Sequence, residues 1–510
     1  MRRFNAVVLF IVLALCVSFA PQASAGVRTI PSIDRLPLGD WTYDAMISLA
    51  ADGLVPGFSA RVFEGDRLFN RIEMAQVVAS IVESSEEKDL GFNQVALIGH
   101  LVSEFKPELR YVNEEALNEW TERSTNISLP TGGEAFLIGY VRGMAADDSG
   151  DMDSDDDEEI SYRATGFFNI SNNVFAMGTA ADKEDQFFQQ LRDNQTLDKI
   201  FLRGTSSNFA WSVGREYLNW GPAYSGSLIL SDNSPALTQI RMSKEIDFGK
   251  LFGRVKITQF AGAFADNDQR LYLLGRRYEK RLSDRWYAGI SETAKTSETP
   301  NPLVMILPFY LYQHMFIDVD EKFNVLCAAD LTYRTKSGSQ IYTELVVDDM
   351  TAPRIFWGNK NKRPRKTGYT VGCYVPNILH GDRYSSFRAE YTLIDRLTYI
   401  ATRADSPEMA YTQDDEIIGH PIGPNAKALY LRGENYFSDK FSVIAEYLNQ
   451  KQTKAGKPER GSSRVSSLMA AYDITPDKSI ALRVSPYKIT APGSAAMDGT
   501  KYELRASFAF

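Results

Sequence analysis

The last ten residues, Lys501-Tyr-Glu-Leu-Arg-Ala-Ser-Phe-Ala-Phe510, alternate between two kinds of side chain. Apolar residues occupy the even positions from Tyr502 to Phe510, and Glu503, Arg505 and Ser507 lie between them. Because successive side chains of a β-strand point to opposite faces, this segment predicts a strand with one apolar and one hydrated face. An edge strand in the sheet of a soluble protein remains the alternative.

The same alternation recurs many times from Phe136 onward. Apolar Phe387, Ala389 and Tyr391 alternate with polar neighbours, and so do Ile480 and Leu482. Repeated period-two segments separated by turns are typical of a transmembrane barrel, and we count roughly 16 to 20 of them. A sheet in hydrocarbon must close, because every backbone N–H and C=O needs a partner there. The pattern therefore predicts an all-β transmembrane barrel of antiparallel strands over residues 131–510; a β-rich periplasmic protein is the runner-up.

Composition agrees with this fold. The 510-residue chain has a mean hydropathy of -0.27, too polar for a helical membrane protein, and its 12% aromatic content suits a barrel with interfacial girdles. The terminal strand ending in Phe510 resembles the signal read by the barrel-assembly machinery, which we expect as a partner during insertion. The net charge of -9 argues against nucleic acid as a partner.

The N-terminus predicts secretion. Arg2 and Arg3 precede an apolar run from Ala6 to Ala20, and Ala23-Ser24-Ala25 offers a small-x-small cleavage site. These features predict a signal peptide over residues 1–25. Of the three cysteines, Cys327 and Cys373 remain after cleavage; a disulfide and two separate thiols are both open.

A helical region over residues 26–130 is predicted to precede the barrel, in the periplasm. Apolar stripes predict helices over 41–51, ended by Asp52-Gly53, over about 71–83 with Asn70 as cap, and over about 92–109. Short turns near Asp395, 438–439 and 476–477, against long polar segments near 402–425, 451–462 and 488–498, place the C-terminus in the periplasm.

Residues of about 34–84 resemble one S-layer homology unit. The matching stretches are Asp40-Trp41 with Tyr43 and Ala45, Leu49 to Val55, Phe63, and Arg71 to Ala75. The resemblance implies contact with peptidoglycan or another wall polymer, with Trp41, Arg71 and Glu73 as wall-contact candidates. The family often carries three copies, whereas one is found here. A helical hairpin that packs on or plugs the barrel is the alternative.

The densest motif is Gly214-Arg-Glu-Tyr-Leu-Asn-Trp-Gly-Pro-Ala-Tyr-Ser-Gly-Ser-Leu-Ile-Leu-Ser-Asp-Asn-Ser-Pro235. With Tyr287 to Glu292, Asn301-Pro302, Arg388 to Tyr391 and Ile418 to Asn425, it resembles the Wzi-type capsule-assembly outer-membrane proteins. The resemblance spans about residues 135–510 and implies a closed barrel of about 18 strands. It also implies lectin-like binding of surface polysaccharide, to hold or assemble a capsule.

Sugar binding needs aromatic faces and planar polar groups. The candidates in the motif are Arg215, Tyr217, Asn219, Trp220, Tyr224, Asp232 and Asn233. The cationic stretch 360–366 adds Lys362, Arg363 and Arg365, which would attract an anionic glycan or the phosphates of lipopolysaccharide. The alternatives are a structural loop at the barrel rim and a solvated cationic loop.

Catalysis and metal binding find little support. An EF-hand loop starting at Asp151 would need Gly at its sixth position and Glu at its twelfth, where Asp156 and Tyr162 stand, so the acidic run 147–159 predicts a solvated loop with loose cation binding. The four histidines show neither H-E-x-x-H spacing nor a nucleophile elbow. We expect no cofactor, no metal and no enzymatic activity, and outer-membrane lipid and lipopolysaccharide as surroundings. A porin tethered to the wall and a glycan-modifying enzyme are the two alternative functions.

Overall fold

The structure is a computed structural model. It describes residues 30–126, 134–149, 157–181, 197–206, 208–249, 253–266, 269–300, 323–348, 366–379, 383–401, 407–453, 461–490 and 496–510. The predicted signal peptide and the cationic stretch 360–365 lie outside the described residues. No helix within the described ranges is long and apolar enough to cross a membrane.

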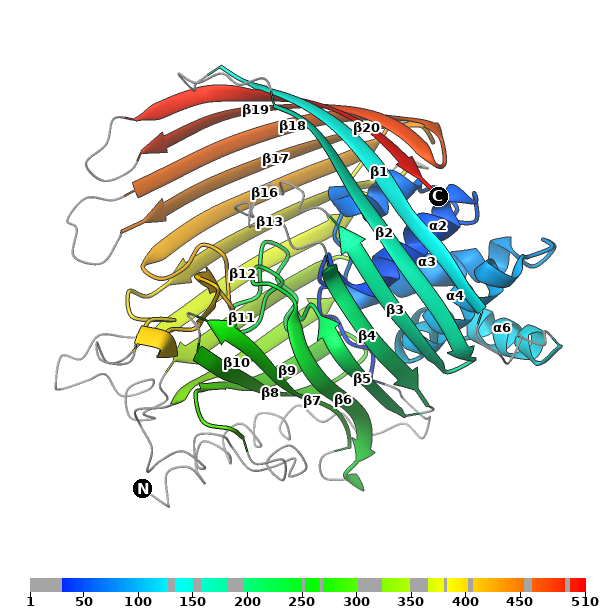
Figure 1. The fold of residues 1–510 in the computed structure, drawn as a ribbon, viewed down its shortest axis with the longest axis horizontal. Helices are drawn as coiled ribbons and strands as arrows, with labels where there is room; N and C mark the ends of the chain where they lie inside the picture. The colour runs from blue at the N-terminus through cyan, green and yellow to red at the C-terminus, as the bar shows by residue number, and fades with distance from the viewer. Residues whose placement is uncertain are drawn as a thin grey trace.

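Eighteen strands form one closed sheet (Figure 1). Each strand is antiparallel to the next, and β1 pairs with β20 from Tyr140–Ala509 to Asp148–Lys501, which closes the barrel. The predicted fold is confirmed. The strands are β1 (Glu134–Asp148), β2 (Asp157–Ser171), β3 (Val174–Ala181), β4 (Leu197–Thr205), β5 (Phe209–Glu216), β6 (Leu237–Asp247), β7 (Arg254–Asp266), β8 (Gln269–Arg281), β9 (Trp286–Thr296), β10 (Phe323–Arg334), β11 (Gln340–Asp348), β12 (Thr367–Pro376), β13 (Ser385–Ile394), β16 (Ala426–Tyr436), β17 (Phe441–Gln452), β18 (Gly461–Thr475), β19 (Lys478–Thr490) and β20 (Met497–Ala509).

The apolar face of the terminal strand points outward. Leu504 of β20 is 55% exposed and pairs with Leu482 of β19, which is 49% exposed. Arg505, their polar neighbour, faces the lumen and is buried. Such an apolar outer band meets hydrocarbon without cost, while the lumen keeps the polar side chains.

The two ends of the barrel differ in their connections. Two residues join β2 to β3 and β18 to β19, and four residues join β16 to β17. The C-terminus lies at this end, where the Phe510 amide donates to the carbonyl of Gly139. We call it the turn end and the opposite end the loop end, because segments 217–236 and 395–425 leave the strands there.

The short turn predicted near Asp395 is wrong. Asp395 begins the 31-residue segment 395–425 at the loop end, between β13 and β16. Its carboxylate accepts from the Thr367 hydroxyl at 2.6 Å, and its amide donates to the Thr367 carbonyl at 2.8 Å. These bonds fasten the residue to β12. A two-stranded hairpin, β14 (Thr412–Gln413) with β15 (Glu416–Ile417), lies inside the segment.

Helices precede the barrel: α2 (Trp41–Ala51), the short π-helix η1 (Val62–Asp66), α3 (Arg71–Ser84), α4 (Phe92–Glu104), α5 (Lys106–Val112) and α6 (Glu114–Asn126). Asn70 and Glu73 form a capping box on α3, as their spacing suggests. The single helix predicted over 92–109 is wrong. The chain breaks between α4 and α5 because Pro107 lacks an amide hydrogen and its ring would clash with the preceding turn.

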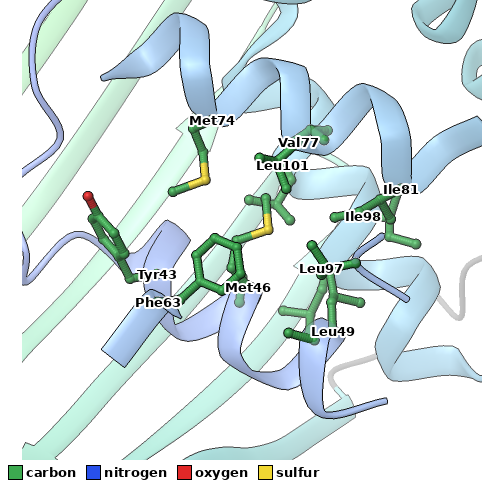
Figure 2. Packing of buried hydrophobic residues seen from close by; sticks show 14 of the residues in the cluster. Tyr43, Met46, Leu49, Phe63, Met74, Val77, Ile81, Leu97, Ile98 and Leu101 are labelled. Carbon is green, nitrogen blue, oxygen red and sulfur yellow. The ribbon is translucent and has the colours of Figure 1, made fainter. Parts of the chain in front are cut away.

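The helices gather at the turn end, beside the C-terminus (Figure 1). Figure 2 shows Met46 and Leu49 of α2 packed against Met74, Val77 and Leu97 from α3 and α4. The same apolar cluster continues into the barrel wall, where the Trp41 ring lies 4.8 Å from that of Phe175 on β3. Residues 30–126, which we call the helical plug, are therefore packed into the turn end of the lumen rather than held apart from it.

Candidate functional site

The glycine-rich motif of the sequence leaves β5 at the loop end and folds into the lumen as segment 217–236. At one side its Trp220 ring packs edge-on against Phe260 of β7, with 5.2 Å between centroids. At the other side Tyr224 stacks on Tyr430 of β16, with 5.9 Å between centroids. The segment therefore spans the lumen from one wall to the other, and we call it the crossing loop.

Two wall carboxylates hold the backbone of the crossing loop. Glu344 of β11 accepts from the amides of Ala223 and Leu228 at 2.9 and 2.8 Å. Glu390 of β13 accepts from the amides of Tyr224 and Ser225 at 2.5 and 2.8 Å. Each carboxylate thus satisfies two backbone donors that would otherwise be buried without a partner.

This path explains two of the glycines. Gly221 has a φ of 137°, and a Cβ there would lie 2.2 Å from Oε1 of Glu344. Gly226 has a φ of 141°, and a Cβ there would lie 2.4 Å from the ring of Pro421. Both the backbone conformation and the lack of space require glycine.

Segment 395–425 covers the crossing loop from the loop end. Tyr399 donates its hydroxyl hydrogen to the Leu228 carbonyl, and Tyr411 donates to the Ile229 carbonyl at 2.8 Å. The Ser231 amide donates to the Ile418 carbonyl at 2.8 Å. The two segments share one apolar core that includes Leu228, Tyr399, Tyr411 and Ile418.

His420 lies at the junction of these segments and is 1% exposed. Its Nδ1 accepts from the Ile422 amide at 3.3 Å, so the ring proton sits on Nε2, which is 3.4 Å from both the Ser225 and the Thr392 hydroxyl oxygens. Burial, aided by the charge of Arg35, lowers the pKa of His420 to about 3. The imidazole is therefore neutral and structural at neutral pH.

Arg35 joins the helical plug to the crossing loop. Its guanidinium donates to the Asp232 carboxylate from Nη1 at 2.9 Å and to Oδ1 of Asn219 at 2.9 Å. In turn, Nδ2 of Asn219 donates to the Arg35 carbonyl at 3.0 Å. Burial acts to raise the pKa of Asp232, but the charge of Arg35 outweighs it and holds that pKa below its usual range.

Most predicted polysaccharide-binding residues are thereby engaged inside the protein. Asn219, Trp220 and Tyr224 are buried, and Asn233 donates to the Ile417 carbonyl at 2.9 Å. Tyr217 donates its hydroxyl to Asp198 at 2.6 Å, and its ring fills the space above Gly39. The structure brings these residues and Asp232 together as one lumenal assembly.

The remaining predicted residues are Arg215 and the three residues of the cationic stretch. Arg215 pairs across the sheet with Ile200, and its side chain is half-buried. Lys362, Arg363 and Arg365 lie outside the described residues.

The predicted wall-contact residues are buried or half-buried in the plug. Trp41 packs on the barrel wall, Glu73 caps α3, and Arg71 donates to Glu104 at 2.7 Å and to Glu108 at 2.9 Å.

A cavity of about 160 Å³ lies between the helical plug and the inner wall of β4 to β8. Tyr217 and Asn219 of the crossing loop line it together with Arg71 and Glu104 of the plug and Arg203 and Arg241 of the wall. Its volume is below that of common ligand pockets, which restricts any occupant to a small polar group. The cavity unites two sets of predicted residues that are far apart in the sequence.

Sequence reasoning missed Arg35, Glu344, Glu390, Tyr399 and Tyr411. The two glutamates carried a signal, because each stands at a polar position of an alternating strand. That position predicts that the side chain faces the lumen, but it does not identify the group that the side chain binds. Arg35 carried no such signal, since it precedes the first helix in an irregular segment.

Comparisons with known proteins agree with this architecture. The family model described as "Capsule assembly protein Wzi" matches residues 82–497. Among solved structures, the chain is similar to Wzi of Escherichia coli, described as an outer membrane protein involved in group 1 capsule assembly and as a carbohydrate-binding β-barrel. That similarity has a TM-score of 0.55 at 12% identity and covers 94% of this chain and 99% of that one.

Further similarities are weaker. The outer membrane protein opdK of Pseudomonas aeruginosa has a TM-score of 0.43 at 10% identity, covering 74% of this chain and 98% of that one. This level of similarity supports no inference about function. A search among functionally curated proteins matched none.

Proposed function

Because this chain belongs to the Wzi capsule assembly family, we propose that it is an outer-membrane barrel that binds surface polysaccharide and helps to assemble or attach a capsule. The E. coli relative is described as carbohydrate-binding, which supports the same ligand class here. Outer-membrane lipid and lipopolysaccharide then surround the apolar outer band.

The observation that carries this proposal is the path of the crossing loop. Trp220 meets β7, Tyr224 meets β16, and Glu344 and Glu390 hold the backbone between them. A lumen crossed in this way is suited to holding a polymer at its mouth rather than to passing solutes. The crossing loop thus favours a binding barrel over the porin alternative.

The helical plug is assigned to the periplasm. Barrels carry short turns on the periplasmic side and long loops outside. The plug contacts the turns: the Ala60 amide donates to the Pro476 carbonyl at 2.9 Å, and the Tyr111 hydroxyl donates to the Asp284 carbonyl at 3.3 Å. These contacts support a periplasmic plug and an external loop end, where polysaccharide arrives.

The candidate residues divide into two roles. Asn219, Trp220, Tyr224, Asp232 and Asn233 act as positioning residues, because their polar atoms and rings hold the crossing loop in place. Direct glycan contact is assigned to Lys362, Arg363 and Arg365, whose charge suits an anionic polymer. Tyr217 lines the cavity and offers an aromatic face to a small polar occupant.

Attachment to the cell wall through residues 34–84 has weaker support. Trp41, Arg71 and Glu73 all make internal contacts within the plug. This placement favours the alternative, in which the S-layer-like segment is a hairpin that plugs the barrel.

Binding without catalysis is part of the proposal. The two carboxylates nearest the motif, Glu344 and Glu390, each accept two backbone hydrogen bonds. A carboxylate committed in this way is poorly placed to act as a general acid or base. This supports the non-enzymatic assignment over a glycan-modifying enzyme.

Two measurements on the purified full-length barrel test the function. Surface plasmon resonance would measure binding of polysaccharide extracted from the surface of the same bacterium, and planar bilayers would measure conductance. We expect saturable binding without steady conductance. Steady open-channel conductance without polysaccharide binding would establish the porin alternative instead.

A further inference from the structure

One sector of the barrel wall carries a cluster of basic side chains that the proposed function does not use. Arg142 of β1, Arg163 of β2, Lys199 and Arg203 of β4, and Arg505 of β20 all face the lumen and are largely buried. Strands β20, β1, β2, β3 and β4 are consecutive around the barrel, so these five residues lie on one side of its inner wall, with buried aromatic side chains such as Phe175 and Phe201 between them. We call these five residues the basic sector.

Every member of the basic sector is paired with a carboxylate of the helical plug. Asp44 of α2 lies 2.6 Å from Arg163 and 2.5 Å from Lys199. Glu104 of α4 lies 2.5 Å from Arg203.

The π-helix η1 supplies the other two partners. Oε2 of Glu64 lies 3.1 Å from Nη2 of Arg142, and Oδ1 of Asp66 lies 2.5 Å from Nη2 of Arg505. All five cations of the basic sector therefore face a plug carboxylate, although Asp66 also pairs with Arg61 of the plug and Glu104 with Arg71 of the plug.

Carboxylates of the barrel wall lie further from the cations of the basic sector than the plug carboxylates do. Among the described residues, Asp198 lies 3.2 Å from Arg163, Glu216 lies 3.8 Å from Arg203, and Glu503 lies 3.9 Å from Arg505. In each case the plug carboxylate is the nearer partner. Without the plug, the basic sector would keep an excess of positive charge.

A gain in folding stability does not explain why ion pairs join the plug to the basic sector. Buried ion pairs seldom stabilise more than apolar contacts of the same volume, because both charges lose their hydration. The same plug shows that apolar packing on the wall is available, since Trp41 and His100 pack on Phe175 of β3 in the middle of the sector. Arginines instead suit the recognition of carboxylates, which they bind with paired donors.

We propose that the basic sector is a binding path for the carboxylates of an acidic polysaccharide, and that Asp44, Glu64, Asp66 and Glu104 occupy it in the closed barrel. This rests on the proposed function and names its ligand class as a uronate-containing polymer. The plug carboxylates present to the wall the same group that a uronic acid carries. Displacement of the plug would exchange one set of carboxylates for the other.

The test neutralises plug carboxylates in the full-length protein. The variant carries Asp44→Asn, Glu64→Gln and Asp66→Asn, and the matched control carries Glu86→Gln, Glu87→Gln and Glu115→Gln, which removes equal charge from exposed positions of the plug. Oligogalacturonate is the acidic probe and a dextran oligomer of equal length the neutral one. Fluorescence polarisation measures the affinity for each labelled oligomer, and circular dichroism checks that the strand content is retained.

We expect the triple variant to bind oligogalacturonate about tenfold more tightly than the wild type, which corresponds to about 1.4 kcal/mol. Its affinity for dextran should not change, and the control should match the wild type. Adding Arg163→Gln to the triple variant should reverse part of the gain. If the triple variant does not fold, Asp44→Asn alone should give a smaller gain in the same direction, because this carboxylate faces two cations.

An equal gain for dextran, or no gain for oligogalacturonate in a folded variant, overturns the inference. The proposed function is judged separately by wild-type binding of the native surface polysaccharide. A wild type that binds that polymer together with a variant that gains nothing would remove only the basic-sector proposal. A wild type that fails to bind it would remove the proposed function even if the variant gains affinity.

Discussion

Nη1 of Arg35 lies 2.9 Å from Oδ2 of Asp232, a residue 197 positions further along the chain. This ion pair joins the first described segment of the helical plug to the crossing loop inside the barrel. Both side chains are almost fully buried. The helical plug, which fills the turn end of the lumen, and the crossing loop, which enters from the loop end, therefore form one connected structure.

Replacing Arg35 by methionine should destabilise the protein by about 3 kcal/mol, because it leaves the buried Asp232 charge without its main partner. Urea unfolding in detergent, followed by tryptophan fluorescence, measures the change. The control is Arg383→Met, which breaks an ion pair with Asp439 whose partners are 47% and 84% exposed. The free energy of unfolding of this control should fall by at most about 1 kcal/mol. Equal losses at both sites would contradict the role of Arg35.

Gly221→Ala should displace the crossing loop and destabilise the barrel. The new Cβ would meet Glu344 at 2.2 Å, and the φ of 137° is unfavourable for alanine, so the crossing loop must leave its path. Because the helical plug still fills the turn end of the lumen, we expect a lower urea midpoint for unfolding in detergent and no steady conductance. Gly433→Ala on β16 is the matched control, since its Cβ would have nothing within 4 Å. Equal urea midpoints for Gly221→Ala and Gly433→Ala would argue that Gly221 does not fix the path of the crossing loop.

Acidification should loosen the plug through His100 of α4. Its Nε2 lies 2.8 Å from Oδ1 of Asn169, and burial lowers its pKa to about 4, against about 6.5 in an unfolded chain. Above pH 6.5 both states are neutral and the residue has no effect. As the pH falls from 6.5 to 4, the unfolded state gains the proton first, which reduces stability by roughly 3 kcal/mol.

Asp44 and Asp66 lose their contribution to stability only at a lower pH than His100. Burial acts to raise the pKa of each, but Arg163 and Lys199 outweigh it at Asp44, and Arg505 and Arg61 at Asp66, so both lie below the usual range. Their contribution is present above about pH 4 and is lost only as the pH falls through the lowered values. His100→Gln should therefore remove part of the acid sensitivity between pH 6.5 and 4, as urea unfolding at several pH values would measure. An unchanged pH profile would contradict the assignment to His100.

Leu504→Lys should weaken the barrel by about 2–4 kcal/mol, since it places a charge on the hydrocarbon face near the middle of β20. The measurement is the urea midpoint for unfolding from lipid vesicles. Leu504→Val, which keeps the face apolar, is the control and should lose less. A Leu504→Lys protein as stable as the control would mean that this face does not meet lipid.

The fold was accessible from the sequence because strand alternation is a local property. Leu504 and Leu482 point outward and Arg505 inward for the same reason that they alternate in the sequence: successive side chains of a strand face opposite ways. The cap at Asn70 is local too, and it marked the start of α3 correctly. Pro107 was an equally local signal, and the helix break that it causes was missed.

The site was accessible only in part. The glycine-rich motif was recognised as the densest feature of the sequence. Its composition, however, would be the same in a loop that binds a ligand and in a loop that seals a lumen. Whether Trp220 meets a sugar or Phe260 depends on which wall lies opposite, and that wall comes from residues 40 positions away.

The sequence by itself determined the strand pattern, the outward apolar band, the helical start and the family, because each rests on side chains close together in the chain. The tertiary structure decided what fills the lumen. Arg35 with Asp232, Asp44 with Arg163 and Glu390 with the Tyr224 amide are contacts between distant segments. Such partners become neighbours only when β1 pairs with β20 and the closed barrel brings its walls around the plug.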